Sequence, residues 1–206
     1  MINWKQLKKQ EEDTFDDVPK PKRLNKNITT LIKNYNTEIS TKDISQALFM
    51  RFYNHKYSIS NAYIFNWESD YLTVTDSDYV IEIESKISKS DFKDDFKKSE
   101  KHNLLEAQEA DNTKRPNKLY YACPRGLLGT WELPKHAGLL EVYRDKEGEL
   151  VCETIKEAKF IHKDIILDNI KSTLLLKFSW RMKEMLLRNY ENYLEILPSE
   201  NNTIDL

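Results

Sequence analysis

Three strand-like runs follow one another closely in the first half of the chain, and they limit the fold more than any other sequence feature. They cover residues 61–67 (NAYIFNW), 70–75 (DYLTVT) and 79–87 (YVIEIESKI). Asp76, Ser77 and Asp78 supply turn-forming side chains between the last two runs, as expected where a chain reverses direction between strands. We therefore predict a β-hairpin over residues 70–87.

Helical patterns lie on both sides of this block. In residues 40–54, Ile44, Leu48 and Phe52 recur at i, i+4 and i+8 on one face, and Ser40 with Asp43 forms a variant of the capping box. Further helices are predicted over residues 90–102, with Ser90 as N-cap, and over 164–196; further strands over 118–123, 137–143 and 150–154. This order predicts an α/β fold with a central mixed β-sheet flanked by helices and followed by a long C-terminal helix.

The domain organisation follows from length and from the distribution of charge. A chain of 206 residues is long enough for one well-buried core. Residues 1–38 are of mixed charge and contain Pro19 and Pro21, so we expect a mobile or peripheral N-terminal segment. Residues 39–198 are predicted to form a single domain, and residues 199–206 a frayed tail.

Composition restricts the classes of function. The net charge is −2, so nucleic-acid binding needs a local basic patch and not a strong overall field. Only four glycines are present, which nearly excludes a Gly-rich nucleotide-binding loop. The start of the chain lacks the apolar stretch of a signal peptide, and no run reaches membrane-spanning length, so we expect a soluble, cytoplasmic protein.

The hairpin carries the residues with the clearest chemical potential. Glu84 and Lys86 are two apart on a strand and therefore share a face. If the turn spans Asp76–Asp78, Asp70 lies opposite Glu84, and two carboxylates and a lysine converge. A two-residue turn would shift the register by one and separate them.

These residues resemble a known nuclease signature. Ser69-Asp70 followed by Glu84-Ser85-Lys86 is similar to the motif of the PD-(D/E)XK, or restriction-endonuclease-like, nuclease superfamily. The continuations IESKISKSDFKDDFKKSEKH (83–102), KLYYACPRGLL (118–128) and LPKHAGLLEVY (133–143) resemble members near the MmcB-like DNA-repair group and its phage relatives. The resemblance covers roughly residues 40–160.

The resemblance implies a restriction-endonuclease-like core that hydrolyses DNA phosphodiester bonds in DNA repair, recombination or phage–host conflict. Asp70 and Glu84 would bind Mg²⁺, for which Mn²⁺ can substitute, with the Ser85 carbonyl as a further candidate ligand. Lys86 would position the attacking water or stabilise charge in the transition state. The DNA phosphates would be contacted by lysines of the following helix: Lys89, Lys93, Lys97 and Lys98.

Two departures from the family pattern concern the acidic residues and the proline. Ser69 stands where the motif has proline. The acid that many relatives carry on the first helix has only candidates here, Asp43 and Glu38, and Glu68 could replace it from the same strand as Asp70. The number of metal ions therefore stays open.

Other interpretations of the same residues stay open as well. Glu84 and Lys86 could form an ordinary surface ion pair, and the lysine stripe could be a solvated helix face. A non-cleaving module on this scaffold, binding nucleic acid or a protein partner, is the alternative function. Convergence of Asp70, Glu84 and Lys86 in one open cleft with an acidic floor favours the enzyme, and a salt-bridged cluster on a flat surface would rule it out. The C-terminal stripe with Trp180, Met182 and Met185 is interpreted as core or as a homodimer helix.

Overall fold

The computed structural model describes residues 38–97, 99–107 and 109–196. The chain divides between Asn36 and Thr37, and every described residue belongs to the second unit. The predicted N-terminal segment, apart from Glu38, and the predicted tail over residues 199–206 lie outside the described residues.

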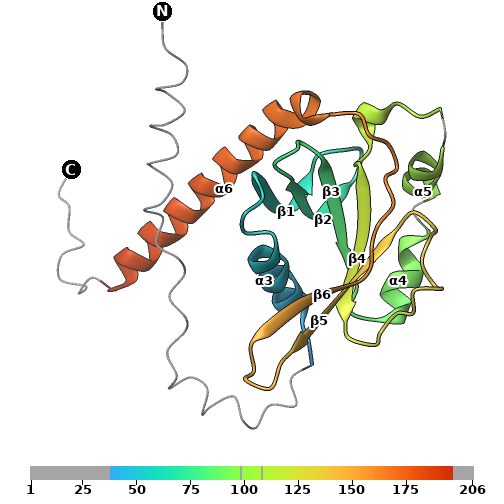
Figure 1. The fold of residues 1–206 in the computed structure, drawn as a ribbon. Helices are drawn as coiled ribbons and strands as arrows, with labels where there is room; N and C mark the ends of the chain where they lie inside the picture. The colour runs from blue at the N-terminus through green and yellow to red at the C-terminus, as the bar shows by residue number, and fades with distance from the viewer. Residues whose placement is uncertain (1–37, 98, 108, 197–206) are drawn as a thin grey trace, which may run out of the picture. The chain divides into compact units, whose positions relative to one another are not determined.

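A six-stranded mixed sheet forms the centre of this unit (Figure 1). Its strands lie side by side in sequence order, antiparallel from β1 to β3, parallel from β3 to β5, and antiparallel again from β5 to β6. Their bounds are β1 Tyr57–Tyr63, β2 Glu68–Val74, β3 Val80–Ser85, β4 Lys118–Pro124, β5 Gly138–Arg144 and β6 Leu150–Lys156. The predicted α/β fold with a mixed sheet is confirmed.

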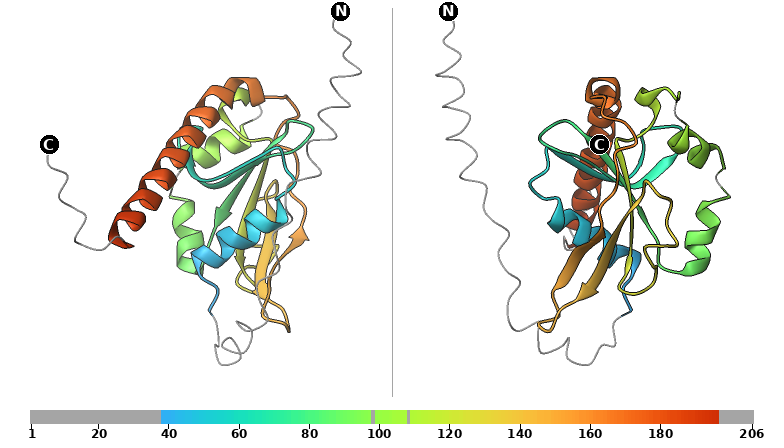
Figure 2. Two further views of the ribbon diagram at one scale, coloured as in Figure 1. Left: turned by 90° about the vertical axis from the view of Figure 1, so that its left-hand side faces the viewer. Right: turned by 45° about the vertical axis from the view of Figure 1, so that its right-hand side comes forward.

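Successive residues of each strand point to opposite faces of the sheet, and helices pack on both faces. Ile81 and Ile83 of β3 join the cluster under α3 (Thr41–Arg51). On β4, Tyr121 packs with α4 (Lys89–Asp95) and α5 (Ser99–Glu106), so α3 and the α4–α5 pair lie on opposite sides of the sheet (Figures 1 and 2). The long helix α6 (Leu167–Ile196) packs its first turns against β1 and β2.

Two expected elements differ from those observed. β1 lies over residues 57–63 and not 61–67, because Phe65 and Trp67 pack inward from the connection after the strand. The helix expected over 90–102 is two helices, and its N-cap is Ser88, whose side chain accepts a hydrogen bond from the Asp91 backbone N–H at 3.1 Å. Among the described helices, none combines the length and apolarity needed to cross a bilayer.

The predicted cap of α3 is present in full. The Ser40 hydroxyl accepts from the Asp43 backbone N–H at 3.2 Å, and the Asp43 carboxylate accepts from the Ser40 backbone N–H at 2.9 Å. Two N–H groups that the helix itself cannot satisfy are thus paired. The cap sets the point where the chain enters the helix and places Ile44 and Leu48 in the core.

We expect Ser40→Ala to lower the free energy of unfolding by about 1 kcal/mol, because it removes the acceptor for the Asp43 N–H. Ser45→Ala in the same helix is the control and should change stability little. Urea unfolding of both variants measures the difference. Equal stability of the two variants would show that the capping box contributes nothing.

Candidate functional site

The register of the hairpin places Asp70 level with Glu84. Tyr71 pairs with Ile83 and Leu72 with Glu82, so continuing the ladder by one residue brings Asp70 opposite Glu84. This register is the one predicted from a turn over Asp76–Asp78. The Ser85 backbone N–H donates to Asp70 Oδ2 at 2.8 Å, which holds the carboxylate at the end of β3.

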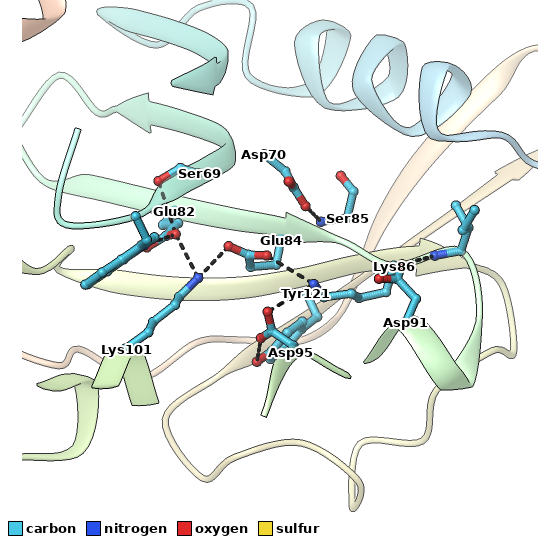
Figure 3. Close-up of polar contacts among 12 residues, drawn as sticks. Ser69, Asp70, Glu82, Glu84, Ser85, Lys86, Asp91, Asp95, Lys101 and Tyr121 are labelled. Carbon is cyan, nitrogen blue, oxygen red and sulfur yellow. Dashed lines mark hydrogen bonds and ion pairs between the residues drawn. The ribbon is translucent and has the colours of Figure 1, made fainter. Parts of the chain in front are cut away.

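The side chains do not share a face as the register alone predicts. Asn61 has a positive φ of 47° where it lies opposite Asp70, and the strands pair on either side of this position, Ser60 with Tyr71 and Ala62 with Ser69. The regular alternation of β2 is broken there, since the Ser69 hydroxyl reaches Glu82 at 3.1 Å. In Figure 3, Asp70 lies on one side of β3, whereas Glu84 lies on the other.

Glu84 is the centre of a buried ion-pair network. One carboxylate oxygen accepts from Lys86 Nζ at 3.1 Å, and the other accepts from Lys101 Nζ of α5. Glu84 is 1% exposed and Lys86 4%, so this is neither an open cleft nor a surface ion pair. Burial by itself raises the pKa of Glu84, but the ammonium groups of Lys101 and Lys86 outweigh it and bring the pKa below its ordinary value.

Asp95, at the end of α4, holds Lys86 from the other side. Its carboxylate pairs with Lys86 Nζ at 3.2 Å and His102 Nε2 at 3.2 Å, and it accepts from the Tyr121 hydroxyl at 2.9 Å (Figure 3). Burial raises the pKa of Asp95, yet the contact with His102 and the charge of Lys86 hold it well below its usual range. The same carboxylate thus connects α4 with α5, with β4 and with Lys86, the residue that follows β3.

Glu82 completes the network and is the least satisfied of its charged groups. Its Oε1 accepts from Trp67 Nε1 at 2.7 Å, Ser69 Oγ at 3.1 Å and Lys101 Nζ at 3.0 Å. Its Oε2 has no hydrogen-bond partner within the described residues. Burial, the largest effect, raises the pKa of Glu82 to about 7 despite the nearby Lys101 ammonium.

The network contains one carboxylate more than it has ammonium groups. Glu82, Glu84 and Asp95 face the two ammonium groups of Lys86 and Lys101. Burying an uncompensated charge is costly. Among these carboxylates and ammonium groups, leaving aside the His102 imidazole beside Asp95, the charges balance when Glu82 carries a proton, in agreement with the raised pKa of Glu82.

The other residues predicted for the site lie at the surface or outside the described chain. Lys89, Lys93 and Lys97 are exposed; Lys89 pairs with Glu132 at 3.1 Å, and Lys97 pairs with Asp94 at 2.6 Å. Lys98 lies outside the described residues.

The candidates for a third acidic ligand lie elsewhere. Asp43 serves the cap of α3 and pairs with Arg144 at 2.6 Å, and Glu38 and Glu68 are exposed. Over the ranges described, no group of three or more His, Cys, Asp or Glu residues is placed to hold a metal ion. The structure thus supplies no third acidic ligand for the predicted Mg²⁺ site.

Sequence reasoning missed most members of the network, among them Glu82, Asp95, Lys101 and Tyr121. One signal was available, because Glu82, Glu84 and Lys86 place charge on alternate positions of a run whose other residues, apart from Ser85, are apolar. That pattern in a central strand indicates a charged inner face. No local pattern indicates that Lys101 is the residue that reaches it.

Comparison with known proteins shows the fold alone. No family model matches the chain, and no curated protein matches it. A solved structure that is similar is the SPO1766 protein of unknown function from Silicibacter pomeroyi, at a TM-score of 0.51 and 17% identity. The match covers 77% of this chain and 95% of that one.

We expect Asp95→Asn to lower the free energy of unfolding by about 3–5 kcal/mol, because it leaves Lys86 with one buried counter-charge fewer. Asp94→Asn is the matched control, since the Asp94 side chain is 60% exposed, and should cost less than about 0.5 kcal/mol. Urea unfolding at pH 7 gives both values. Similar losses in the two variants would contradict a network that depends on Asp95.

Glu82→Gln tests the proton on Glu82. A raised carboxyl pKa means that the folded state binds the proton more tightly than the unfolded state, so wild-type stability falls as pH rises from about 4.5 to about 7. The variant cannot ionise, and its stability relative to wild type should rise over that window by about 2–3 kcal/mol. Unfolding titrations from pH 4.5 to 8, with exposed Glu68→Gln as control, measure this; a difference that does not vary with pH would refute it.

Proposed function

We propose that the chain is a metal-dependent nuclease of the PD-(D/E)XK type that hydrolyses DNA phosphodiester bonds. The observation that carries the proposal is the position of Asp70 beside Glu84-Ser85-Lys86 at the point where β2 and β3 stop pairing, joined by the 2.8 Å hydrogen bond from Ser85 N–H. The order of α3, three antiparallel strands, α4–α5 and a parallel β4 is the arrangement expected around such a site.

The donor chemistry of the network suits a divalent cation. Mg²⁺ prefers carboxylate oxygens, and Asp70 and Glu84 are the carboxylates that would hold it. The Oε2 atom of Glu82 has no partner within the described residues, and the network has one carboxylate in excess. Asp70 lies on the other side of β3 from Glu84 (Figure 3), so a metal ion held by both carboxylates requires the irregular end of β2 to rearrange. Because Lys101 and Lys86 contact both oxygens of Glu84, metal binding also requires Lys101 to give up its contact with Glu84.

A bound Mg²⁺ ion would polarise the phosphate and activate a water molecule. Lys86 would contribute a fixed positive charge. Burial lowers its pKa, but the carboxylates of Glu84 and Asp95 outweigh this and raise it above the ordinary value. Lys86 is therefore protonated at neutral pH and would stabilise negative charge on the phosphate, not accept a proton from water.

A surface beside the network suits DNA. Lys89, Lys93 and Lys97 are exposed on and just after α4, which begins three residues after Lys86. The ion pair between Lys89 and Glu132 connects this helix to the loop between β4 and β5. The same loop carries Trp131, which is 85% exposed. Lysines bind phosphates and an exposed indole stacks on unpaired bases, so we propose that this surface contacts the DNA.

One observation favours the second candidate, a catalytically inactive nuclease-fold module that binds nucleic acid or a protein partner. Both oxygens of Glu84 are engaged by lysines, and Glu84 is 1% exposed. In this alternative the network serves only to hold α4 and α5 on the sheet.

Cleavage assays separate the two candidates. Wild type should cleave single-stranded, duplex or branched DNA in the presence of Mg²⁺ or Mn²⁺. Glu84→Gln, Lys86→Met and Asp70→Asn, which keep the size of each side chain, should each lose at least about 100-fold in rate. Lys146→Ala and Glu147→Ala, exposed in the turn between β5 and β6, should leave the rate unchanged.

Melting temperatures and circular dichroism must show that each variant is folded. No cleavage by folded wild type with either metal would favour the binding module. Cleavage that survives in all three site variants would place the active site elsewhere.

A further inference from the structure

One face of α6 belongs to the core of its own domain. Ile170 and Leu174 are 4% and 2% exposed and pack with the apolar residues of β1 and β2, and Phe178 packs against the same cluster one turn later. Arg181 continues this face, because its Nη2 donates to the carbonyl oxygens of Ser60 at 3.2 Å and Asn61 at 3.1 Å. This face is thus turned toward β1.

The rest of the helix surface is apolar where a surface helix is normally charged. Seven large apolar side chains are between 55% and 62% exposed: Leu175, Leu176, Trp180, Met182, Leu186, Leu187 and Tyr190. At 3.6 residues per turn, six of them lie away from the face that carries Ile170, Leu174 and Phe178, and Met182, four residues after Phe178, borders that face. Lys183 is the charged residue among them, and its ammonium lies 4.9 Å from the ring centre of Trp180.

We propose that this apolar face of α6 is a dimer interface occupied by the same face of a second copy of the chain. The size of the face is suitable. Aromatic side chains such as Trp180 and Tyr190 bury about 150–250 Å² each when fully covered, and Leu and Met side chains bury about 60–120 Å² each, from about 1.5–3 kcal/mol at about 25 cal/mol per Å². Seven that are a little over half exposed therefore offer on the order of 500 Å², and two copies about 1,000 Å², the size at which a specific interface begins. A standard interface buries about 800 Å² per partner.

The charges favour a second copy over other occupants. Nucleic acid or an anionic lipid surface is met by several basic groups around the contact, whereas this face presents Lys183 alone among its described residues. Arg181 lies on the other face, bound to backbone carbonyls and 3.7 Å from Glu184. Two copies related by a two-fold axis bury one apolar surface against an identical one without bringing strong charge together.

The mass of the full-length chain in solution tests the proposal. Sedimentation equilibrium from about 1 to 100 µM should give twice the 24.5 kDa of one chain at the upper concentrations. Leu186→Lys and Leu187→Lys should each weaken association by at least about 100-fold, because each places an unpaired charge in both halves of the interface. Met50→Lys on α3, where Met50 is 51% exposed, is the control and should still dimerise.

Each other outcome overturns the proposal. A monomeric wild type at every concentration would mean that the face is not a site for a second copy. A dimer unaffected by both lysine variants would place the interface elsewhere. Binding of monomeric wild type to phosphatidylcholine–phosphatidylserine vesicles, lost in the same variants, would identify a membrane surface as the occupant. Unchanged circular dichroism of the variants excludes unfolding as the cause, since these side chains are exposed in a single chain.

Discussion

The buried network around Glu84 is the constraint on which the rest of the site depends. Glu82 and Glu84 project from the central strand β3, and their counter-charges come from Lys86 on the same chain segment and from Lys101 on α5. Charges removed from water are tolerated only when they are paired and hydrogen-bonded. The sheet therefore carries two acidic side chains in its interior only while α5 is in place.

The need for Lys101 beside Glu82 and Glu84 explains why the segment after β3 forms two helices and not one. A single straight helix over residues 90–102 would present Lys89, Lys93, Lys97 and Lys101 along one face. The break between α4 and α5 separates them, so that Lys89, Lys93 and Lys97 stay in water while Lys101 is 3% exposed beside Glu82. The basic surface proposed for DNA and the buried cation of the network thus come from one lysine-rich stretch.

The Glu84 carboxylate has a structural role and, in the proposed nuclease, a chemical role as well. Glu84 compensates Lys86 and Lys101 in the folded chain, and in the proposed nuclease it would also bind the metal. A divalent cation must therefore contribute more than the Lys101 contact that it replaces. Lys86 keeps its second counter-charge, Asp95, in either arrangement, so its orientation does not depend on Glu84 alone.

Features that depend on neighbours along the chain could be predicted from the sequence. The Ser40–Asp43 cap and the turn over Asp76–Asp78 are local, and this turn sets the β2–β3 register that brings Asp70 level with Glu84. The order of helices and strands gave the mixed sheet for the same reason, since hydrophobic periodicity is read within each segment.

The direction in which the chemical groups point depends on contacts between distant parts of the chain, so it could not be predicted from the sequence. The irregular position at Asn61 and Asp70 arises between paired strands, and it places Asp70 on the other side of β3 from Glu84 (Figure 3). Lys101 resembles any solvated lysine in its local sequence, and it becomes a buried counter-charge because the chain brings α5 over two carboxylates seventeen and nineteen residues earlier. Burial and pairing of charge depend on such distant contacts, which no local pattern contains.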